Sequence, residues 1–175
     1  MKKFLMYIGL VFLLLILFRG PLFRILIKYN EIGEREEIKI TNQNLLNKID
    51  TNSSNQALRI DEIIRIAKLL TNQELRFTFK SASGDPNKIF DSKKANCVGY
   101  SAMFNSLVNH LLHKNGLQAK YTAKHKIGQI KFCGINTHQF LNGQFFKDHD
   151  YNEIINLETE SKIIIDPSIS DFFRF

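Results

Sequence analysis

Three residues whose types can carry thiol chemistry occur along the chain in the order Cys97, His149 and Asp166. A cysteine can act as a nucleophile, a histidine as the base that takes its proton, and an aspartate as the carboxylate that orients the imidazole ring. Nucleophile, base and orienting group are the three parts of a thiol acyl-transfer site. The trio therefore predicts chemistry that passes through a thioester.

Cys97 is expected in the first turn of a helix. Asn96 before it is a favourable N-cap, and Lys114-Asn115-Gly116 is typical of a helix end. Between them, apolar residues recur at helical spacing: Phe104, Leu107, Val108, Leu111 and Leu112. Unpaired amide groups and the helix dipole at the start of a helix favour a thiolate over a thiol. We therefore interpret Cys97 as a nucleophile rather than as a small core residue.

His149 and Asp166 fall on two predicted strands, residues 149–156 and 162–166, which a polar turn joins. If the hairpin is centred near residues 157 and 158, the two side chains become cross-strand neighbours with β-carbons about 5 Å apart. Pro167 has no N–H to donate and so ends the second strand directly after Asp166. His138 is the alternative base.

Other candidate sites have weaker support in the sequence. His110 and His113 lie three residues apart on the cysteine helix, but no third ligand is placed to complete a metal site, so we expect neither a metal nor another cofactor. An oxyanion formed at Cys97 needs a second donor beside the Cys97 backbone N–H. Asn96 and Thr78 are the two candidates, and the sequence does not choose between them.

The three segments together resemble the transglutaminase-like family of papain-like cysteine enzymes. The resemblance covers residues 60–170 approximately and rests on Asn-Cys-Val-Gly-Tyr-Ser-Ala at 96–102, His-Asp-Tyr-Asn-Glu-Ile at 149–154 and Ile-Ile-Asp-Pro-Ser at 164–168. It implies that Cys97 is the nucleophile, His149 the general base and acid, and Asp166 the orienting carboxylate. The family often has a tryptophan after the histidine or the aspartate, whereas this chain has none.

The order of predicted elements favours an α+β domain in which the cysteine helix packs on an antiparallel sheet. A helix capped by Asp61 and a strand at residues 75–79 precede the cysteine helix, and two strands at residues 119–123 and 127–133 follow it. With the resemblance, this becomes a papain-like, transglutaminase-like fold. Cys133 is expected as a core residue at the end of its strand, because a disulfide with Cys97 would silence the nucleophile.

The formal charge of +7 does not indicate a nucleic-acid-binding protein, because of where the charge lies. Five of the 24 basic residues, and no acidic residue, precede residue 29, which leaves 19 basic and 17 acidic residues in the rest of the chain. A nucleic-acid interface would need clustered Lys and Arg on the domain itself. We therefore expect no nucleic-acid partner.

Residues 4–18 are apolar without a break and predict an N-terminal transmembrane helix. The run covers about 22 Å, short of a hydrocarbon core of about 30 Å, but Lys3 and Arg19 can snorkel and the apolar character continues after Pro21. No Ala-x-Ala cleavage pattern follows, so a single-pass anchor is favoured over a removed signal peptide. Basic residues flank both sides, and the position of the run at the N-terminus favours an exported domain.

These observations divide the chain into a membrane anchor at residues 1–28, a linker with short elements at 29–60 and a transglutaminase-like domain at 61–175. The predicted function is a membrane-anchored, thiol-dependent acyl transferase or peptidase-like amide hydrolase that acts on a protein or peptide. The alternative is a catalytically inactive domain of the same fold that serves as a membrane-tethered binding or assembly module.

Overall fold

The computed structural model of the chain describes residues 2–53, 57–141 and 148–169. A five-stranded antiparallel sheet forms its centre, with the strand order β1-β4-β6-β7 and the short β5 paired to the end of β4. The strands are β1 (Ile27–Arg35), β4 (Tyr121–Phe132), β5 (Ile135–Asn136), β6 (His149–Asn156) and β7 (Lys162–Ile165). The long β4 therefore connects the N-terminal strand to the C-terminal hairpin.

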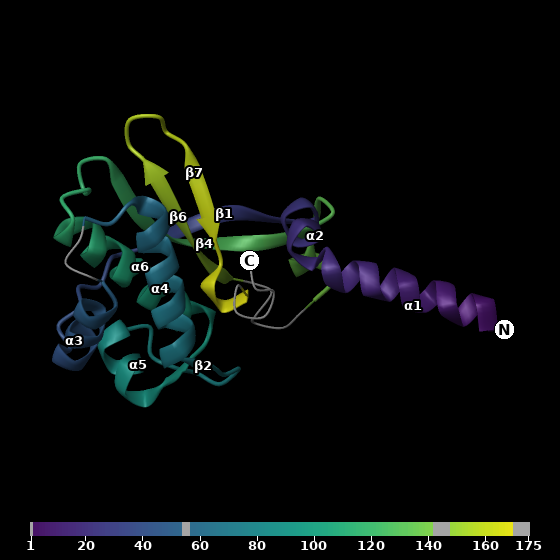
Figure 1. Cartoon of the computed structure of the whole chain (residues 1–175), viewed down its shortest axis with the longest axis horizontal. Coiled ribbons are helices and arrows are strands. Elements are labelled where there is room, and N and C mark those ends of the chain that lie inside the picture. Colours follow the sequence, from purple (N-terminus) through teal and green to yellow (C-terminus); the bar gives the residue numbers. More distant parts are fainter. Residues whose placement is uncertain (1, 54–56, 142–147, 170–175) are drawn as a thin grey trace.

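Four helices gather on one side of the sheet (Figure 1). The longest of them, α6 (Cys97–Lys114), packs directly on β4 and β6, and α4 (Ile60–Glu74) packs on α6. The shorter α3 (Gln43–Asn52) and α5 (Pro86–Ser92) complete the group. A separate parallel pair joins β2 (Arg76–Phe77), which follows α4, with β3 (Lys94–Ala95), which directly precedes α6.

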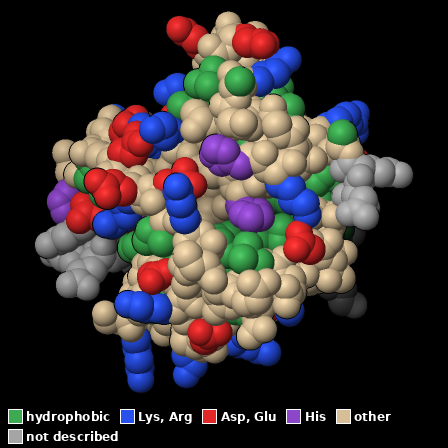
Figure 2. Space-filling model, turned by 90° about the vertical axis from the view of Figure 1, so that its left-hand side faces the viewer, with side chains coloured by type: hydrophobic (Ala, Val, Ile, Leu, Met, Phe, Trp, Pro, Cys, Tyr) green, Lys and Arg blue, Asp and Glu red, His purple; other side chains and the backbone are tan. Residues whose placement is uncertain are grey.

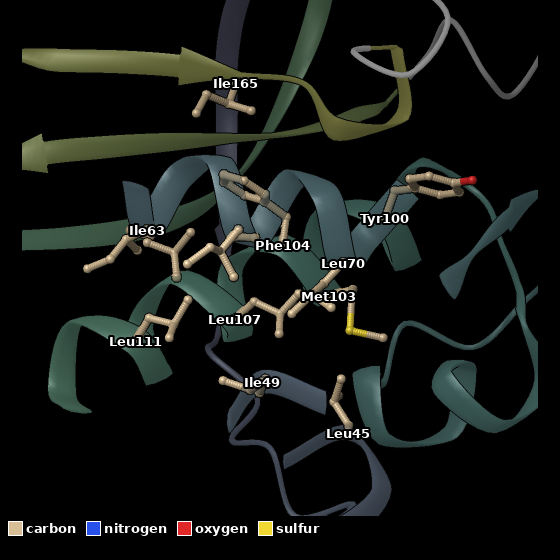
Figure 3. Close-up of a cluster of buried hydrophobic side chains, with 14 of the residues drawn as sticks. Leu45, Ile49, Ile63, Leu70, Tyr100, Met103, Phe104, Leu107, Leu111 and Ile165 are labelled. Atoms are coloured by element: carbon tan, nitrogen blue, oxygen red, sulfur yellow. The ribbon is translucent and has the colours of Figure 1, made fainter. Parts of the chain in front are cut away.

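The hydrophobic core lies between α6, its neighbouring helices and the sheet. Figure 3 shows Phe104 and Leu107 of α6 pointing toward side chains of α3 and α4, with Ile165 of β7 on the sheet side. Phe104 and Leu107 are fully buried, as are Leu45 and Ile49 of α3. Burial on almost every side of α6 fixes the direction of its first turn, where Cys97 lies.

The structure confirms an α+β domain with an antiparallel sheet and with the cysteine helix packed on it. It corrects the interpretation of residues 29–60 as a linker, because this segment contains most of β1 and all of α3. The segment is polar in composition since β1 exposes many of its side chains and α3 buries only two. Composition therefore hid two elements that belong to the folded unit.

Several predicted boundaries shift. The two strands expected at 119–123 and 127–133 form one continuous strand, β4, and the strand expected at 75–79 shortens to Arg76–Phe77. The helix expected to be capped by Asp61 begins at Ile60, with Arg59 as its N-cap and the Glu62 side chain accepting from the Arg59 amide. The helix is thus capped two residues earlier than the sequence suggested.

Cys133 does not occupy the core position expected for it. It follows the end of β4, is exposed, and has a left-handed backbone with φ of 50°. The strand ends at Phe132, and Cys133 and Gly134 form the tight turn that leads into β5. Both cysteines are free thiols.

The apolar N-terminal run forms α1 (Lys2–Leu17), which projects away from the rest of the molecule (Figure 1). By length and hydropathy, no single helix among the described residues is sufficient to cross a bilayer. A pair made of residues 7–17 and α2 (Arg19–Leu26) meets those criteria together, with a bend of 74° between its halves. The transmembrane prediction therefore rests on this bent pair rather than on one straight helix.

Shortening a buried side chain of α3 tests whether this helix belongs to the folded unit. Ile49→Ala removes a fully buried side chain from the core and is expected to lower the free energy of unfolding by about 2–5 kcal/mol, measured by urea denaturation. Ile135→Ala, at a position 55% exposed, serves as the control and should change it by less than about 0.5 kcal/mol. Equal effects of the two substitutions would mean that α3 is peripheral.

Candidate active site

Cys97 is the first residue of α6 and is 7% exposed. The Asn96 side chain accepts a hydrogen bond of 3.3 Å from the Gly99 amide, which is the N-cap that the sequence predicts. The thiol therefore lies at the positive end of a long helix dipole, in a position shielded from most solvent. The position at the helix start is typical of a reactive cysteine, whereas burial is shared with cysteines that only fill a core.

His149 begins β6 and is bonded to Asp166, which directly follows β7. The distance between His149 Nε2 and Asp166 Oδ2 is 2.5 Å. The register differs from the expected one: Ile155 pairs with Lys162, so a continued ladder would place Asp166 opposite Tyr151 rather than His149. The histidine and the aspartate are thus diagonal neighbours on one face, two residues apart in register, and their side chains still meet.

The electrostatics of His149 connect all three predicted residues. Burial by itself lowers the pKa of His149, but the charge of Asp166 and the hydrogen bond to it act in the opposite direction, as does a hydrogen bond with Cys97. Together they raise the pKa from 6.5 to about 10. The structure therefore brings Cys97, His149 and Asp166 together.

Asp166 has more partners than the sequence suggested. The Tyr29 hydroxyl donates to the same Oδ2 at 2.7 Å, while the backbone and the hydroxyl of Ser168 donate to Oδ1 at 3.1 and 2.7 Å. Burial raises the pKa of Asp166, but the positive charge of His149 and these hydrogen bonds outweigh it and lower that pKa below 3.8. The carboxylate is consequently held ionised and in one orientation.

Tyr29 is a site residue that sequence reasoning missed. It comes from β1, in the segment interpreted as a linker, and its ring stacks on Tyr151 at 4.6 Å and on His149 at 5.9 Å between ring centroids. Burial and the neighbouring Asp166 raise its pKa, so the hydroxyl keeps its proton and acts as a donor. The residue paired with His149 on β4 is Gly128, where a β-carbon would come within 2.8 Å of the Tyr151 ring, so only glycine fits there.

A second buried carboxylate lies on the other face of β6. Asp150 is fully buried and accepts from Arg35 at 2.5 Å, and its Oδ2 lies 2.7 Å from His125 Nε2. The bond to Asp150 raises the pKa of Arg35, with a smaller electrostatic contribution from Cys97, so the guanidinium lies within electrostatic range of the nucleophile. A fixed positive charge there favours negative charge on the sulfur or on an adjacent oxyanion.

The alternative residues are placed elsewhere or are already engaged. His138 lies in the short helix η1 (Thr137–Gln139) after β5, and it is His149 that binds Asp166. The Asn96 side chain caps α6, and the Thr78 hydroxyl accepts from the Lys80 amide at 3.2 Å. Within the described ranges, no group of three or more His, Cys, Asp or Glu side chains is arranged to hold a metal ion.

A cleft of about 330 Å³ lies beside Asp166, between α2, β1 and β7. Tyr29 and Asp166 line it together with Phe23 of α2, Ile27 of β1 and Ile164 of β7. Its walls therefore come from the N-terminal segment and from the edge of the sheet. The Asp166 carboxylate therefore shares a cleft with α2, the helix that follows α1.

Comparison with family models, with curated proteins and with solved structures finds no match. The transglutaminase-like resemblance thus remains a prediction. What the site can do has to follow from its own geometry: a thiol at a helix start, an imidazole in contact with it, and a buried carboxylate behind the imidazole.

The protonation state of His149 can be observed directly. With a pKa near 10, the His149 imidazole is expected to remain protonated at pH 8, as measured by the ring carbon and nitrogen NMR shifts. Asp166→Asn removes the charge that contributes most to offsetting burial and should lower the pKa of His149. His110 is an internal control because burial lowers its pKa, so it should be neutral at pH 8 in both proteins. Titration of His149 below pH 7 in the wild type would contradict this electrostatic picture.

Proposed function

We propose that the protein is a thiol-dependent acyl transferase or amide hydrolase of the transglutaminase-like, papain-like class. The observation that carries the proposal is the contact series in which Asp166 binds His149 and His149 contacts Cys97. A buried carboxylate behind the imidazole orients the ring and stabilises its protonated form. The substrate supplies an acyl group, of which the amide of a protein or peptide is the favoured form.

The reaction follows from the positions of these groups. The Cys97 sulfur, as thiolate, attacks the carbonyl carbon and forms a carbon–sulfur bond, while the carbonyl electrons move to oxygen. As the carbonyl re-forms, the carbon–nitrogen bond breaks and protonated His149 gives its proton to the leaving amine. Water or a second amine then attacks the thioester, His149 takes the proton, and the carbon–sulfur bond breaks. Hydrolysis and transfer differ only in this last nucleophile.

The alternative is an inactive domain that uses this fold for binding or assembly. The observation that favours it is burial, since Cys97 is 7% exposed and His149 fully buried, as structural side chains would also be. The two functions differ in the reactivity of the thiol. An activated Cys97 reacts at acidic pH, whereas a structural Cys97 does not.

Relative alkylation of the two cysteines tests the thiol chemistry. An ordinary thiol with a pKa of about 8.5 is only about 0.3% ionised at pH 6. If His149 activates Cys97, iodoacetamide at pH 6 should modify buried Cys97 faster than exposed Cys133, as measured by peptide mass spectrometry. His149→Ala should abolish this preference, and Asp166→Asn should reduce it less because an amide can still hold the ring.

Cys133 provides the control for this experiment within the same molecule. Cys133→Ser should leave the modification rate of Cys97 unchanged, because Cys133 lies in the turn after β4 and is not a partner of His149. Faster modification of Cys133 than of Cys97 in the wild type, in a chain that remains folded, would favour the inactive binding module.

We further propose that α1 attaches the domain to a membrane. Most of its described large apolar side chains are about half exposed or more, including Phe4 at 69%, Phe12 at 63% and Leu17 at 64%. An apolar rod about 24 Å long that projects from a folded domain is stable in contact with lipid rather than with water. The bent pair with α2 allows either a broken span or insertion from one side.

Fractionation tests the attachment. The full-length chain is expected to sediment with membranes and to resist carbonate extraction, whereas a chain that starts at Arg19 should be recovered soluble and folded. The shortened chain keeps Ile27 and Lys28 because both residues pair with β4 and belong to the sheet. Intact full-length protein in the soluble fraction would contradict attachment, and a product shortened after residue 18 would identify a signal peptide instead.

A further inference from the structure

A second cleft, of about 690 Å³, lies beside the start of α6. Its walls come from β2, from β3, from α5 and from the loop between β2 and α5. Four of its lining residues are basic, and none of those in the described part of the chain is acidic. We call this site the basic cleft and its four cations the cleft cations: Arg76, Lys80, Lys88 and Lys94.

The cleft cations are exposed, and none of them makes an ion pair with a residue that the structure describes. Nearby basic residues behave differently: Lys93, next to Lys94, binds Glu74 at 2.6 Å, and Lys48 binds the same carboxylate. The charge in the basic cleft is therefore left uncompensated, which attracts an anionic ligand. The hydroxyls of Ser81 and Ser83 line the same cleft and can donate to such a ligand.

The basic cleft is continuous with the backbone that carries the nucleophile. Lys94 belongs to β3, which leads through Asn96 to Cys97. The loop packs against the first turn of α6 so closely that a β-carbon on Gly99 would lie 3.1 Å from the Ser83 carbonyl oxygen. A ligand in the cleft is thus held at a fixed position relative to the Cys97 thiol.

Aromatic rings border the same region. The Phe77 ring lies 5.9 Å from that of Tyr100, one turn after Cys97, and 5.1 Å from that of Phe79. Phe79 is 86% exposed. An extended ligand between the thiol and the cleft cations would therefore meet apolar surface first and positive charge beyond it.

We propose that the basic cleft binds an acidic stretch of the polypeptide substrate, adjacent to the acyl group that Cys97 attacks. The inference rests on the proposed thiol chemistry, because a ligand next to the thiol must offer an acyl group attached to a leaving amine, and a polypeptide supplies one in every peptide bond. The positive charge is also gathered in one part of the surface. In Figure 2 acidic and basic side chains are mixed over the face shown, while basic ones project at its lower edge, the end that carries α5 and β2 in Figure 1.

A binding experiment that does not depend on catalysis tests this inference. A fluorescein-labelled hexaglutamate peptide is titrated with the full-length protein in detergent at low salt, and fluorescence anisotropy gives the affinity. The double variant Lys80→Gln/Lys88→Gln should bind about fivefold more weakly, as expected for two exposed charge pairs. The matched control Arg65→Gln/Lys131→Gln removes two charges outside the cleft and should bind like the wild type, and added salt should weaken binding.

Two further measurements separate the cleft from the thiol chemistry. Cys97→Ala should bind the peptide as tightly as the wild type, so a failure of the thiol assignment leaves the binding result intact. Lys80→Gln/Lys88→Gln should keep the wild-type rate of Cys97 alkylation, which shows that the variant remains folded. Absence of peptide binding by the wild type, unchanged affinity in the cleft variant, or tighter binding of an oligothymidylate of equal charge overturns the proposal.

Discussion

An ionised carboxylate in the interior sets what the rest of the domain must supply. Asp166 is 3% exposed, and burying such a charge without partners costs on the order of several kcal/mol. Its partners come from three places along the chain: the Tyr29 hydroxyl on β1, the His149 ring on β6, and Ser168 after β7. All of them reach Asp166 only when these strands occupy one sheet in the observed register. The pairing of β1 with β4 is thereby a requirement of the site as well as of the fold.

The alternation of side chains along β6 lets two adjacent residues serve two polar clusters. His149 faces Asp166 and Tyr29 on one side of the sheet, while Asp150 faces His125 and Arg35 on the side of α6. The start of α6 lies within electrostatic range of both clusters, since Cys97 affects the pKa of His149 and that of Arg35. Negative charge that develops there in the proposed reaction would face two cationic groups and the helix end, each held in place by a buried carboxylate or by backbone.

Local sequence signals predicted the parts of the site that depend on local structure. The Asn96 cap and the apolar spacing predicted the start of α6, and the polar turn between two strand segments predicted the hairpin. The register was wrong by two residues, since a turn of several polar residues closes equally well at neighbouring positions. Tyr29 was missed because its role depends on a pairing between residues about 100 positions apart in the chain, and a polar, half-exposed strand such as β1 has no apolar alternation to reveal it.

Enclosure of the triad transfers specificity to the surfaces around it. With Cys97 7% exposed and His149 fully buried, the groups that would attack a carbonyl in the proposed reaction leave little surface for recognising the rest of a substrate. Binding energy must then come from remote contacts, which are effective when they hold the reacting bond in position for attack. The basic cleft lies beside the first turn of α6, and the cleft lined by Tyr29 and Asp166 lies toward α2. Under the proposed function, proteins that share Cys97, His149 and Asp166 but differ along β2, β3 and the N-terminal segment would therefore act on different substrates by the same reaction.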